Sequence, residues 1–448
     1  MTVLLFILGV LFVAVGIAVS IALHEVGHLV PAKAFKVRVT QYMIGFGPTV
    51  FSRRRGETEY GVKALPLGGY VSMVGMYPPN AADETDGTVR SSSTGMFQQL
   101  ATDARSAAAE QLQPGDENRV FYNLPIWKRI IVMLGGPFMN LVIGVVLFAV
   151  LLMGFGTAQS TTTLSEVNQC VITSDQAAQG QTECTDADPA APAYEAGLLP
   201  GDTITEFNGS PVTSWEDLSS RIRDAAGQSV PITYVRDGVE QDTVITPLLT
   251  ERPVADDDGA PTVDDAGNPV TQEVGFIGVA ASTELVRQPG SEVLPAVGEN
   301  LSSIAGVILN LPQRVVDVAQ AAFSSEERDP NGPMSVVGVG RIAGEISSME
   351  EVPLESRVAT LVGLVASVNL ALFVFNLIPL LPLDGGHVAG ALWEGLRRRV
   401  AKLFKRPDPG HFDLAKMLPL TYAVAILLMG MSALLIYADI VKPVSLFN

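Results

Sequence analysis

Four long apolar runs limit the folds open to this chain more than any other feature of its sequence. They cover residues 2–23, 130–158, 358–381 and 418–441. Each provides the ~20 residues that an α-helix needs to cross about 30 Å of hydrocarbon at ~1.5 Å per residue. Of the 448 residues, 48% are hydrophobic and only 17% are charged. The sequence therefore predicts a polytopic α-helical membrane protein with four transmembrane helices.

The first run, residues 2–23, has an alternative interpretation as a cleaved signal peptide. It lacks a basic segment in front of it, however, and it is longer than a typical signal-peptide core. Cleavage near its end would also remove the helix that precedes a metal-binding motif. We therefore expect a first transmembrane domain over residues 1–30 that is retained.

Charge is distributed unevenly between the segments that join the apolar runs. Residues 159–300 hold 24 Asp and Glu against 5 Arg and no Lys. Two other loops are basic, with Lys33, Lys36, Arg38, Arg53, Arg54 and Arg55 after the first run and Arg397, Arg398, Arg399, Lys402, Lys405 and Arg406 after the third. The positive-inside rule assigns both basic loops to the cytoplasm and the acidic segment to the outside. With four spans, the N-terminus and the C-terminus are both expected outside.

An H-E-x-x-H motif, formed by His24, Glu25 and His28, follows the first apolar run directly. On a helix, residues i and i+4 share one face, so both imidazoles reach one zinc ion while the glutamate stands beside it. Zinc lowers the pKa of a bound water to near 7, and Glu25 is the candidate general base toward that water. The motif predicts water-activating chemistry at or inside a membrane.

Asp384 lies at the end of the third run, within the segment Leu-Asp-Gly-Gly-His that closes at His387. An aspartate beside a membrane span is costly unless it is paired or binds a cation. The expected topology brings Asp384 to the same face of the membrane as His24 and His28. Two imidazoles and one carboxylate make a catalytic zinc site with an open fourth position. Each motif alone also occurs by chance, and Asp-Gly-Gly is a common turn, but their joint occurrence at matching depth favours the zinc site.

The pattern of residues 31–76 predicts short strands around Gly45 and Gly47. These two glycines permit tight turns and close backbone approach. We expect a membrane-associated β-hairpin on the cytoplasmic side. It is either an ordinary hairpin or a sheet whose edge pairs with an extended substrate. The polar residues 77–128 predict a flexible cytoplasmic insertion with one weak helix near residues 98–111.

Residues 159–283, between the second and third runs, predict an inserted α+β domain outside the membrane. Turn dipeptides at Asn208-Gly209 and Asp237-Gly238 separate alternating strands, and residues 215–226 have helical spacing. Together with the phrase Ala-Gly-Leu-Leu-Pro-Gly-Asp at 196–202, this order resembles a bacterial PDZ domain. Such domains bind peptide ends by strand addition, and the alternative is a module that only props or occludes the membrane part.

The two cysteines, Cys170 and Cys184, both fall in this external segment, where a disulfide persists. We favour a disulfide over two free thiols that never meet. Residues 284–356 predict amphipathic helices that lie on the membrane or pack on the PDZ-like domain. The third transmembrane helix is expected over 357–390, a basic loop over 391–415, and the fourth helix with its tail over 416–448.

The chain resembles the site-2 protease family of intramembrane zinc metalloproteases in six features taken together. They are H-E-x-x-H, Asn376-Leu-Ile-Pro379, Leu-Asp384-Gly, the Gly45–Gly47 loop, the PDZ-like unit and Gly136-Pro-Phe-Met-Asn140. The resemblance is to the bacterial branch with an extracytoplasmic PDZ insertion. One difference is that Leu381 stands where the family often has a second proline, with Pro382 next.

The resemblance implies zinc as cofactor, His24, His28 and Asp384 as its ligands, and Glu25 as catalytic base. It also implies that Asn376 and Asn140 position substrate or lie on the oxyanion side, with helix–helix hydrogen bonding as the alternative for Asn140. Gly45 and Gly47 would contact substrate through the hairpin. Two other histidines have lesser roles, with His387 orienting Asp384 from behind and His411 solvated on the surface.

The implied activity is endoproteolysis of single-pass membrane proteins in regulated intramembrane proteolysis, such as anti-sigma factors after a first external cut or remnant signal peptides. The implied location is the bacterial plasma membrane, in contact with its lipid and without a nucleic-acid partner. The rival hypothesis is a non-enzymatic membrane adaptor whose PDZ-like domain binds exposed peptide ends, but a structural zinc site needs no base at Glu25. A zinc transporter would require more charged residues along the spans. The sequence leaves the oligomeric state open.

Overall fold

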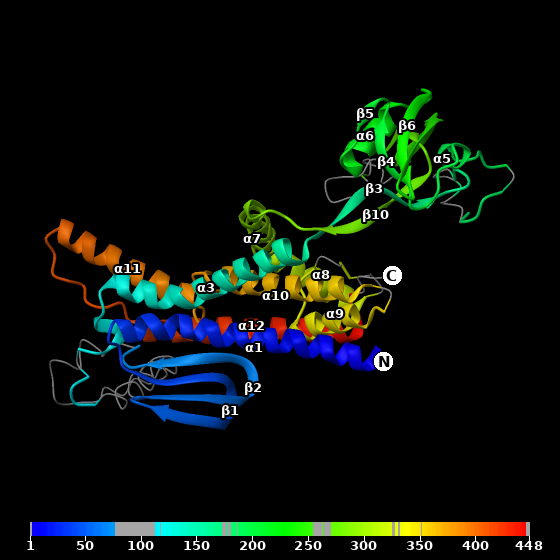
Figure 1. Cartoon of the computed structure of the whole chain (residues 1–448). Coiled ribbons are helices and arrows are strands. Elements are labelled where there is room, and N and C mark those ends of the chain that lie inside the picture. Colours follow the sequence, from blue (N-terminus) through cyan, green and yellow to red (C-terminus); the bar gives the residue numbers. More distant parts are fainter. Residues whose placement is uncertain are drawn as a thin grey trace. The chain divides into compact units, whose positions relative to one another are not determined.

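The computed structural model describes residues 2–444, except 77–112, 117, 173–175, 177–180, 186, 254–261, 263–269, 325–327, 330–331 and 351. These residues form two compact units (Figure 1). Unit 1 combines Met1–Phe155 with Gln288–Asn448, and unit 2 is the intervening Gly156–Arg287. Unit 2 is thus inserted into unit 1 in the sequence, and its bounds lie within a few residues of the expected 159–283.

Unit 1 contains the helices that are long and apolar enough to cross a membrane. Among the described residues they number five, at Thr2–Ala34, Ile126–Phe155, Gly290–Leu309, Leu354–Asn376 and Leu414–Val441. Within these spans lie α1 (Thr2–Ala34), α3 (Ile126–Ala149), α7 (Val293–Leu309), α10 (Leu354–Asn376) and α12 (Leu418–Val441). The four predicted runs correspond to α1, α3, α10 and α12, which makes this a membrane protein. The additional candidate, α7, is the least apolar of the five and falls where the sequence suggested an amphipathic helix.

Helix α1 packs closely on α3 through facing glycines. A Cβ added at Gly27 would lie 2.2 Å from the carbonyl oxygen of Gly135, and one added at Gly135 would lie 2.0 Å from that of Gly27. Small residues at such a crossing allow two backbones to approach, which is the usual way in which helices associate in lipid. This contact falls in the turn of α1 that carries the zinc motif, so it sets the distance between that motif and α3.

The strands β1 (Val39–Arg55) and β2 (Thr58–Met73) form the predicted antiparallel sheet of unit 1 (Figure 1). Each strand bends back on itself, because Tyr42 pairs with Tyr60 on one side and with Val71 on the other. Gly45 and Gly47 adopt φ angles of +91° and +83° in the bend of β1, where L side chains are strained. The sheet is therefore longer and more folded than the hairpin expected from the sequence.

The end of the expected flexible insertion packs on this sheet, and most of the remainder, including the weak helix near 98–111, lies outside the described residues. Asp116 forms a buried ion pair with Arg38, and Arg119 binds both carboxylate oxygens of Glu57 at 2.6 and 2.9 Å. Phe121 is 4% exposed. Because these contacts fix the backbone, the flexible interpretation does not extend to residues 118–128, where α3 already begins at Ile126.

The third transmembrane helix, predicted over residues 357–390, is two separate helices in the structure. α10 ends at Asn376, and a separate helix, α11 (Asp384–Leu403), covers the start of the expected basic loop. Pro379 and Pro382 lie between them, and proline cannot donate the backbone hydrogen bond that would continue a helix. Two shorter helices, α8 (Leu311–Phe323) and α9 (Val336–Ser348), complete unit 1.

Unit 2 is an α+β fold around one apolar core. Its main sheet has the order β10-β3-β4-β6-β7, with β5 paired to β4, and a second hairpin joins β8 to β9. The elements are β3 (Thr157–Val167), α5 (Pro192–Glu195), β4 (Thr203–Phe207), β5 (Ser210–Pro211), α6 (Trp215–Asp224), β6 (Val230–Arg236), β7 (Val239–Ile245), β8 (Leu248–Pro253), β9 (Thr271–Phe276) and β10 (Val279–Val286). The turns predicted at Asn208-Gly209 and Asp237-Gly238 are confirmed, and all four residues have positive φ.

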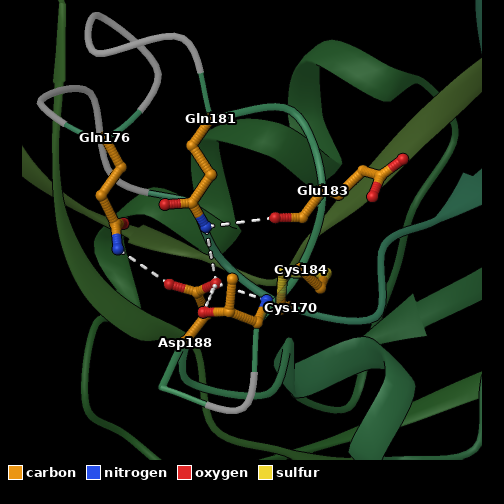
Figure 2. Close-up of a disulfide and its surroundings, with 7 residues drawn as sticks. Cys170, Gln176, Gln181, Glu183, Cys184 and Asp188 are labelled. Carbon is orange, nitrogen blue, oxygen red and sulfur yellow. Dashed lines mark hydrogen bonds between the residues drawn. A yellow bond between two sulfur atoms is a disulfide. The ribbon is translucent and has the colours of Figure 1, made fainter.

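Cys170 and Cys184 form the favoured disulfide (Figure 2). The loop that they close is held by Asp188, whose carboxylate accepts hydrogen bonds from the side chains of Gln176 and Gln181 at 2.8 and 2.7 Å. The backbone N–H and the hydroxyl of Thr185 donate to the same carboxylate, each at 2.8 Å. This segment is therefore stabilised by a covalent link and a hydrogen-bonded carboxylate.

Candidate metal centre

Three ligand atoms from two distant parts of the sequence meet in unit 1. Nε2 of His24 and Nε2 of His28 are 3.2 Å apart, and each lies 3.4 Å from Oδ2 of Asp384. Zinc bonds of about 2.0–2.2 Å at tetrahedral angles put neighbouring ligand atoms about 3.3–3.6 Å apart. The three atoms thus have the spacing of one face of a zinc tetrahedron, and Oδ2 of Asp384 is buried without a hydrogen bond. The side chains present fit the metal.

The two histidines come from one face of α1, and Asp384 is the first residue of α11. Gly385 and Gly386 allow α11 to begin directly against the preceding turn. A Cβ at Gly385 would lie 2.3 Å from the carbonyl oxygen of Ile378, and one at Gly386 would lie 2.5 Å from the backbone nitrogen of Leu381. The two glycines after the aspartate are therefore required by the close turn that brings its carboxylate to α1.

Helix α3 supplies the hydrogen bonds behind both imidazoles. Nδ1 of His28 lies 2.8 Å from the carbonyl oxygen of Val132, and Nδ1 of His24 lies 3.1 Å from the side-chain amide of Asn140. A carbonyl oxygen only accepts, so Nδ1 of His28 carries the proton and Nε2 keeps its lone pair for a metal. Val132, Gly136 and Asn140 share a face of α3, and a Cβ at Gly136 would lie 2.3 Å from Nε2 of His28.

The orientation of the Asn140 amide follows from the same reasoning. Asn140 is 1% exposed, and its Oδ1 has no hydrogen-bond partner when Nδ2 faces His24. Turning the amide over lets Oδ1 accept from Nδ1 of His24, which frees Nε2 of that ring for a metal. Both imidazoles then present the same nitrogen to the site.

Glu25 stands next to this cluster, between α1 and the sheet. Its side chain is 8% exposed, and its Cγ would lie 2.8 Å from a Cβ added at Gly69. Gly69 lies at the start of segment 69–73, which pairs with 39–44 and has no second strand beside it among the described residues. A free sheet edge thus runs past the carboxylate that follows the first histidine.

The remaining candidate residues are more scattered. Asn376 is the last residue of α10, and Gly45 and Gly47 lie in the bend of β1, where a Cβ at Gly45 would meet the carbonyl oxygen of Leu65 at 2.6 Å. His387 is one turn after Asp384, with its Nδ1 buried and without a hydrogen bond. His411, expected on the surface, has 33% of its side chain exposed and lies 3.5 Å from Oε1 of Glu394.

The sequence reasoning missed a buried ion pair close to the site. Oε1 and Oε2 of Glu394, on α11, accept from the guanidinium of Arg129, on α3, at 2.6 and 3.0 Å. Glu394 is fully buried, and Arg129 is 8% exposed. The signal was present, because Arg129 is a charged residue at the start of an apolar run and Glu394 is the one acid between His387 and Arg406. Both ligand-bearing helices are therefore attached to α3.

The chain matches the family described as peptidase family M50 over residues 12–406. Zinc metalloprotease Rip1 of Mycobacterium tuberculosis is 33% identical to it over 452 residues, which cover 99% of this chain and 100% of that protein. Rip1 of Mycolicibacterium smegmatis is 31% identical over 464 residues, with 99% and 100% covered. Metalloprotease MmpA of Caulobacter vibrioides is 25% identical over 405 residues, with 88% of each chain covered.

Proposed function

The chain belongs to peptidase family M50 and is an intramembrane zinc metalloprotease of the site-2 type, and from this premise we propose which residues perform the reaction. His24, His28 and Asp384 hold the zinc ion, and Glu25 is the catalytic base. The observation that carries this proposal is the triangle of ligand atoms, in which the two histidine nitrogens are 3.2 Å apart and each lies 3.4 Å from Oδ2 of Asp384, about 360 residues further along the sequence. The orphaned Oδ2 of Asp384 at its corner supports it.

When bound, zinc acts as a Lewis acid that lowers the pKa of a coordinated water. Glu25 accepts a proton from the attacking water and donates it to the nitrogen of the leaving amine. The water oxygen bonds to the carbonyl carbon, the peptide C–N bond breaks, and one new carboxylate and one new amine result. The near-complete burial of Glu25 keeps bulk water from competing for this proton. The hydrogen bonds that the carbonyl oxygen of Val132 and the side chain of Asn140 accept from the two Nδ1–H groups hold the imidazoles in place during the reaction.

The substrate in this proposal is an extended segment of a single-pass membrane protein. A helical segment shields its own amides, so it has to unwind before it is cleaved. The free edge at 69–73 supports binding by strand addition, because Gly69 lies so near Glu25 that an added Cβ would be 2.8 Å from its Cγ, and the added strand would pass the base. Asn376 would bind substrate from the end of α10, whereas the contact with His24 favours a role for Asn140 behind the metal ligand. Anti-sigma factors cut once outside, and remnant signal peptides, fit this description.

We further propose four core spans, α1, α3, α10 and α12, with both termini outside the bacterial plasma membrane. The basic loops are then cytoplasmic, unit 2 is extracytoplasmic, and α7 packs beside α3 and α10. Unit 2 acts as a PDZ-like domain that limits which external segments reach the protease. The disulfide of unit 2 supports an oxidising compartment. An adaptor that only binds peptide ends would have no use for Glu25.

Replacement of Glu25 by Gln tests the proposal. The purified variant, reconstituted with a tagged single-pass reporter, is expected to retain zinc in metal analysis and to lose cleavage by several orders of magnitude. Glu345→Gln is a matched control, since Glu345 pairs with Arg341 on α9 away from the ligands. Cleavage at the normal rate by the Glu25→Gln variant would refute the assignment of the base. Loss of zinc from that variant would show that Glu25 is itself a ligand.

A further inference from the structure

Helix α11 exposes an apolar stripe in the middle of a basic segment. Its exposed large apolar side chains recur at helical spacing on one face, at Leu392, Trp393, Leu396, Val400, Leu403 and, just past its end, Phe404. Their exposed fractions range from 45% at Val400 to 79% at Leu403. Water-soluble surfaces rarely gather so many large apolar groups in one row, so the stripe indicates a contact surface.

A different face of α11 packs against the rest of unit 1. Gly390, Glu394 and Ala401 are buried, and Glu394 forms its ion pair with Arg129 on α3. Successive residues are rotated by about 100° around a helix, so the centre of the stripe and the centre of the buried face lie about 120° apart. The stripe therefore cannot be covered by the protein core that α11 already packs against.

Basic side chains border the stripe on both sides. On the same helical projection, Arg397 falls on one flank, and Arg399 and Lys402 fall on the other. Arg399 and Lys402 are exposed, and Arg397 is partly exposed. A helix with an apolar face between basic flanks is typical of helices that lie in the plane of a membrane surface. The charges then meet lipid phosphates while the apolar side chains enter the acyl boundary.

The position of α11 in the sequence identifies the occupant of this surface. It begins eight residues after α10 ends at Asn376 and is followed by the span that begins at Leu414. Both of its ends are thus connected to membrane-crossing helices by short segments. The stripe therefore always lies close to a bilayer surface. The clustered positive charge selects anionic headgroups, each Lys or Arg contributing about 1 kcal/mol near such a surface.

We propose that α11 is an in-plane membrane anchor that binds the surface of an anionic leaflet through this stripe and its basic flanks. The proposal is independent of the substrate and of the reaction chemistry. It has a structural consequence, because α11 begins at Asp384. The lipid contact and the carboxylate that faces His24 and His28 are then carried by one rigid helix.

Trp393 provides a direct probe, since the chain has 3 tryptophans and the others lie at 127 and 215. The full-length Trp127→Phe/Trp215→Phe protein would be placed in nanodiscs whose lipids carry bromine at different acyl depths. The expected quenching of Trp393 is strongest for bromine near the headgroup and weak at the bilayer centre. Quenching should increase when phosphatidylglycerol replaces part of the phosphatidylcholine. The Trp127→Phe/Trp393→Phe protein, which reports Trp215 in unit 2, should be unquenched.

Charge variants complete the test. Arg397→Gln/Arg399→Gln/Lys402→Gln is expected to weaken the anionic-lipid effect by about fivefold per charge removed. Arg53→Gln/Arg54→Gln/Arg55→Gln removes equal charge elsewhere and should leave Trp393 quenching unchanged. No quenching of Trp393 at any depth would overturn the proposal, as would maximal quenching at the bilayer centre, which means a spanning helix. Shallow quenching that is the same with and without anionic lipid, and the same in the wild type and the Arg397→Gln/Arg399→Gln/Lys402→Gln variant, would overturn the role of the basic flanks.

Discussion

The side-chain amide of Asn140 lies 3.1 Å from Nδ1 of His24, the ring nitrogen that does not face His28. This contact fixes the ring and its tautomer from behind. Replacing Asn140 by Ala removes the partner and leaves Nδ1 buried without an acceptor. We expect zinc affinity to fall about 10- to 100-fold, which is the usual effect of losing such a partner. Competition with a chromophoric chelator measures it on purified protein without reference to activity.

Asn369 offers a matched control for that experiment. It is also a buried asparagine within a span, but its amide donates to the hydroxyl of Ser20 and to the carbonyl oxygen of Val365. Asn369→Ala should lower the thermal unfolding temperature while zinc affinity stays as in the wild type. Equal losses of zinc affinity in the two variants would show that Asn140 acts through general packing rather than through His24.

The buried ion pair between Arg129 and Glu394 is expected to contribute to the stability of unit 1. Breaking a buried pair leaves one charge uncompensated and costs about 3–5 kcal/mol, whereas removing both partners is often neutral. Glu394→Gln is therefore expected to destabilise unit 1 by an amount in that range. Arg129→Met combined with Glu394→Met should recover part of the loss, because the Glu394 carboxylate also accepts from the backbone N–H of Phe412 at 2.9 Å and pairs with Arg398 at 3.0 Å. Urea unfolding of the protein in detergent, followed by tryptophan fluorescence, gives the two differences.

A second buried ion pair in unit 1 serves as a control for whether the loss of Glu394 also changes zinc binding. Arg328 and Asp439 form a second buried pair, in which Asp439 also accepts from the backbone and side chain of Ser335. Asp439→Asn should destabilise the protein without changing zinc affinity, and Glu394→Gln should change both. Unchanged zinc affinity in Glu394→Gln would mean that this pair stabilises α11 without positioning Asp384.

Features of this structure that depend on local sequence patterns can be predicted from the sequence, and features that depend on how distant segments pack cannot. The i,i+4 spacing of His24 and His28 is local, and the charge rule puts Asp384 on the same face, so the three residues that meet were foreseen. The partner of Asn140 was not, because it depends on how α3 is rotated against α1 where Gly27 meets Gly135. That rotation is a property of the packed pair and leaves no periodic trace in either helix.

The extent of α11 was missed for a different reason. Charge alone predicts a basic loop for its residues, and the apolar run alone predicts a third helix that continues through Pro379 and Pro382. The apolar positions between the arginines carry the helical period, but the same composition also fits an exposed loop. Only the burial of Glu394 against Arg129 distinguishes the two. The free edge at 69–73 likewise depends on a sheet that bends back on itself.

Unit 2 should lose stability in acid because of Asp202. Burial alone would raise the pKa of its carboxyl, but hydrogen bonds from Arg236 and from the backbone N–H of Leu199, with the guanidinium charge, lower it below the ordinary value. An unfolded aspartate titrates near pH 3.9, so the unfolded state binds the proton first. The stabilisation is complete above that value and is lost as the pH falls through the lower folded pKa.

Urea unfolding of a protein that keeps only Trp215 measures this dependence on unit 2. Asp202→Asn should be less stable than the wild type at pH 7, and the gap should shrink as the pH falls below about 4. Asp217→Asn is the control, since Asp217 pairs with Arg221 on an exposed helix face, where such pairs contribute little. A gap between wild type and Asp202→Asn that persists unchanged into acid would contradict the role of Asp202.

The disulfide of unit 2 makes the last prediction. Cys170 and Cys184 are 14 residues apart, and closing a loop of that size restricts the unfolded chain by about 3 kcal/mol in the chain-entropy model. Cys170→Ala/Cys184→Ala should lower the free energy of unfolding of unit 2 by up to that amount, measured through Trp215 as above. The hydrogen bonds to Asp188 keep part of the loop in place, so the loss is expected to be smaller than the model value. A reductant should produce the same loss in the wild type and none in the double variant. A reductant effect of equal size in both proteins would show that it acts elsewhere than on this bond.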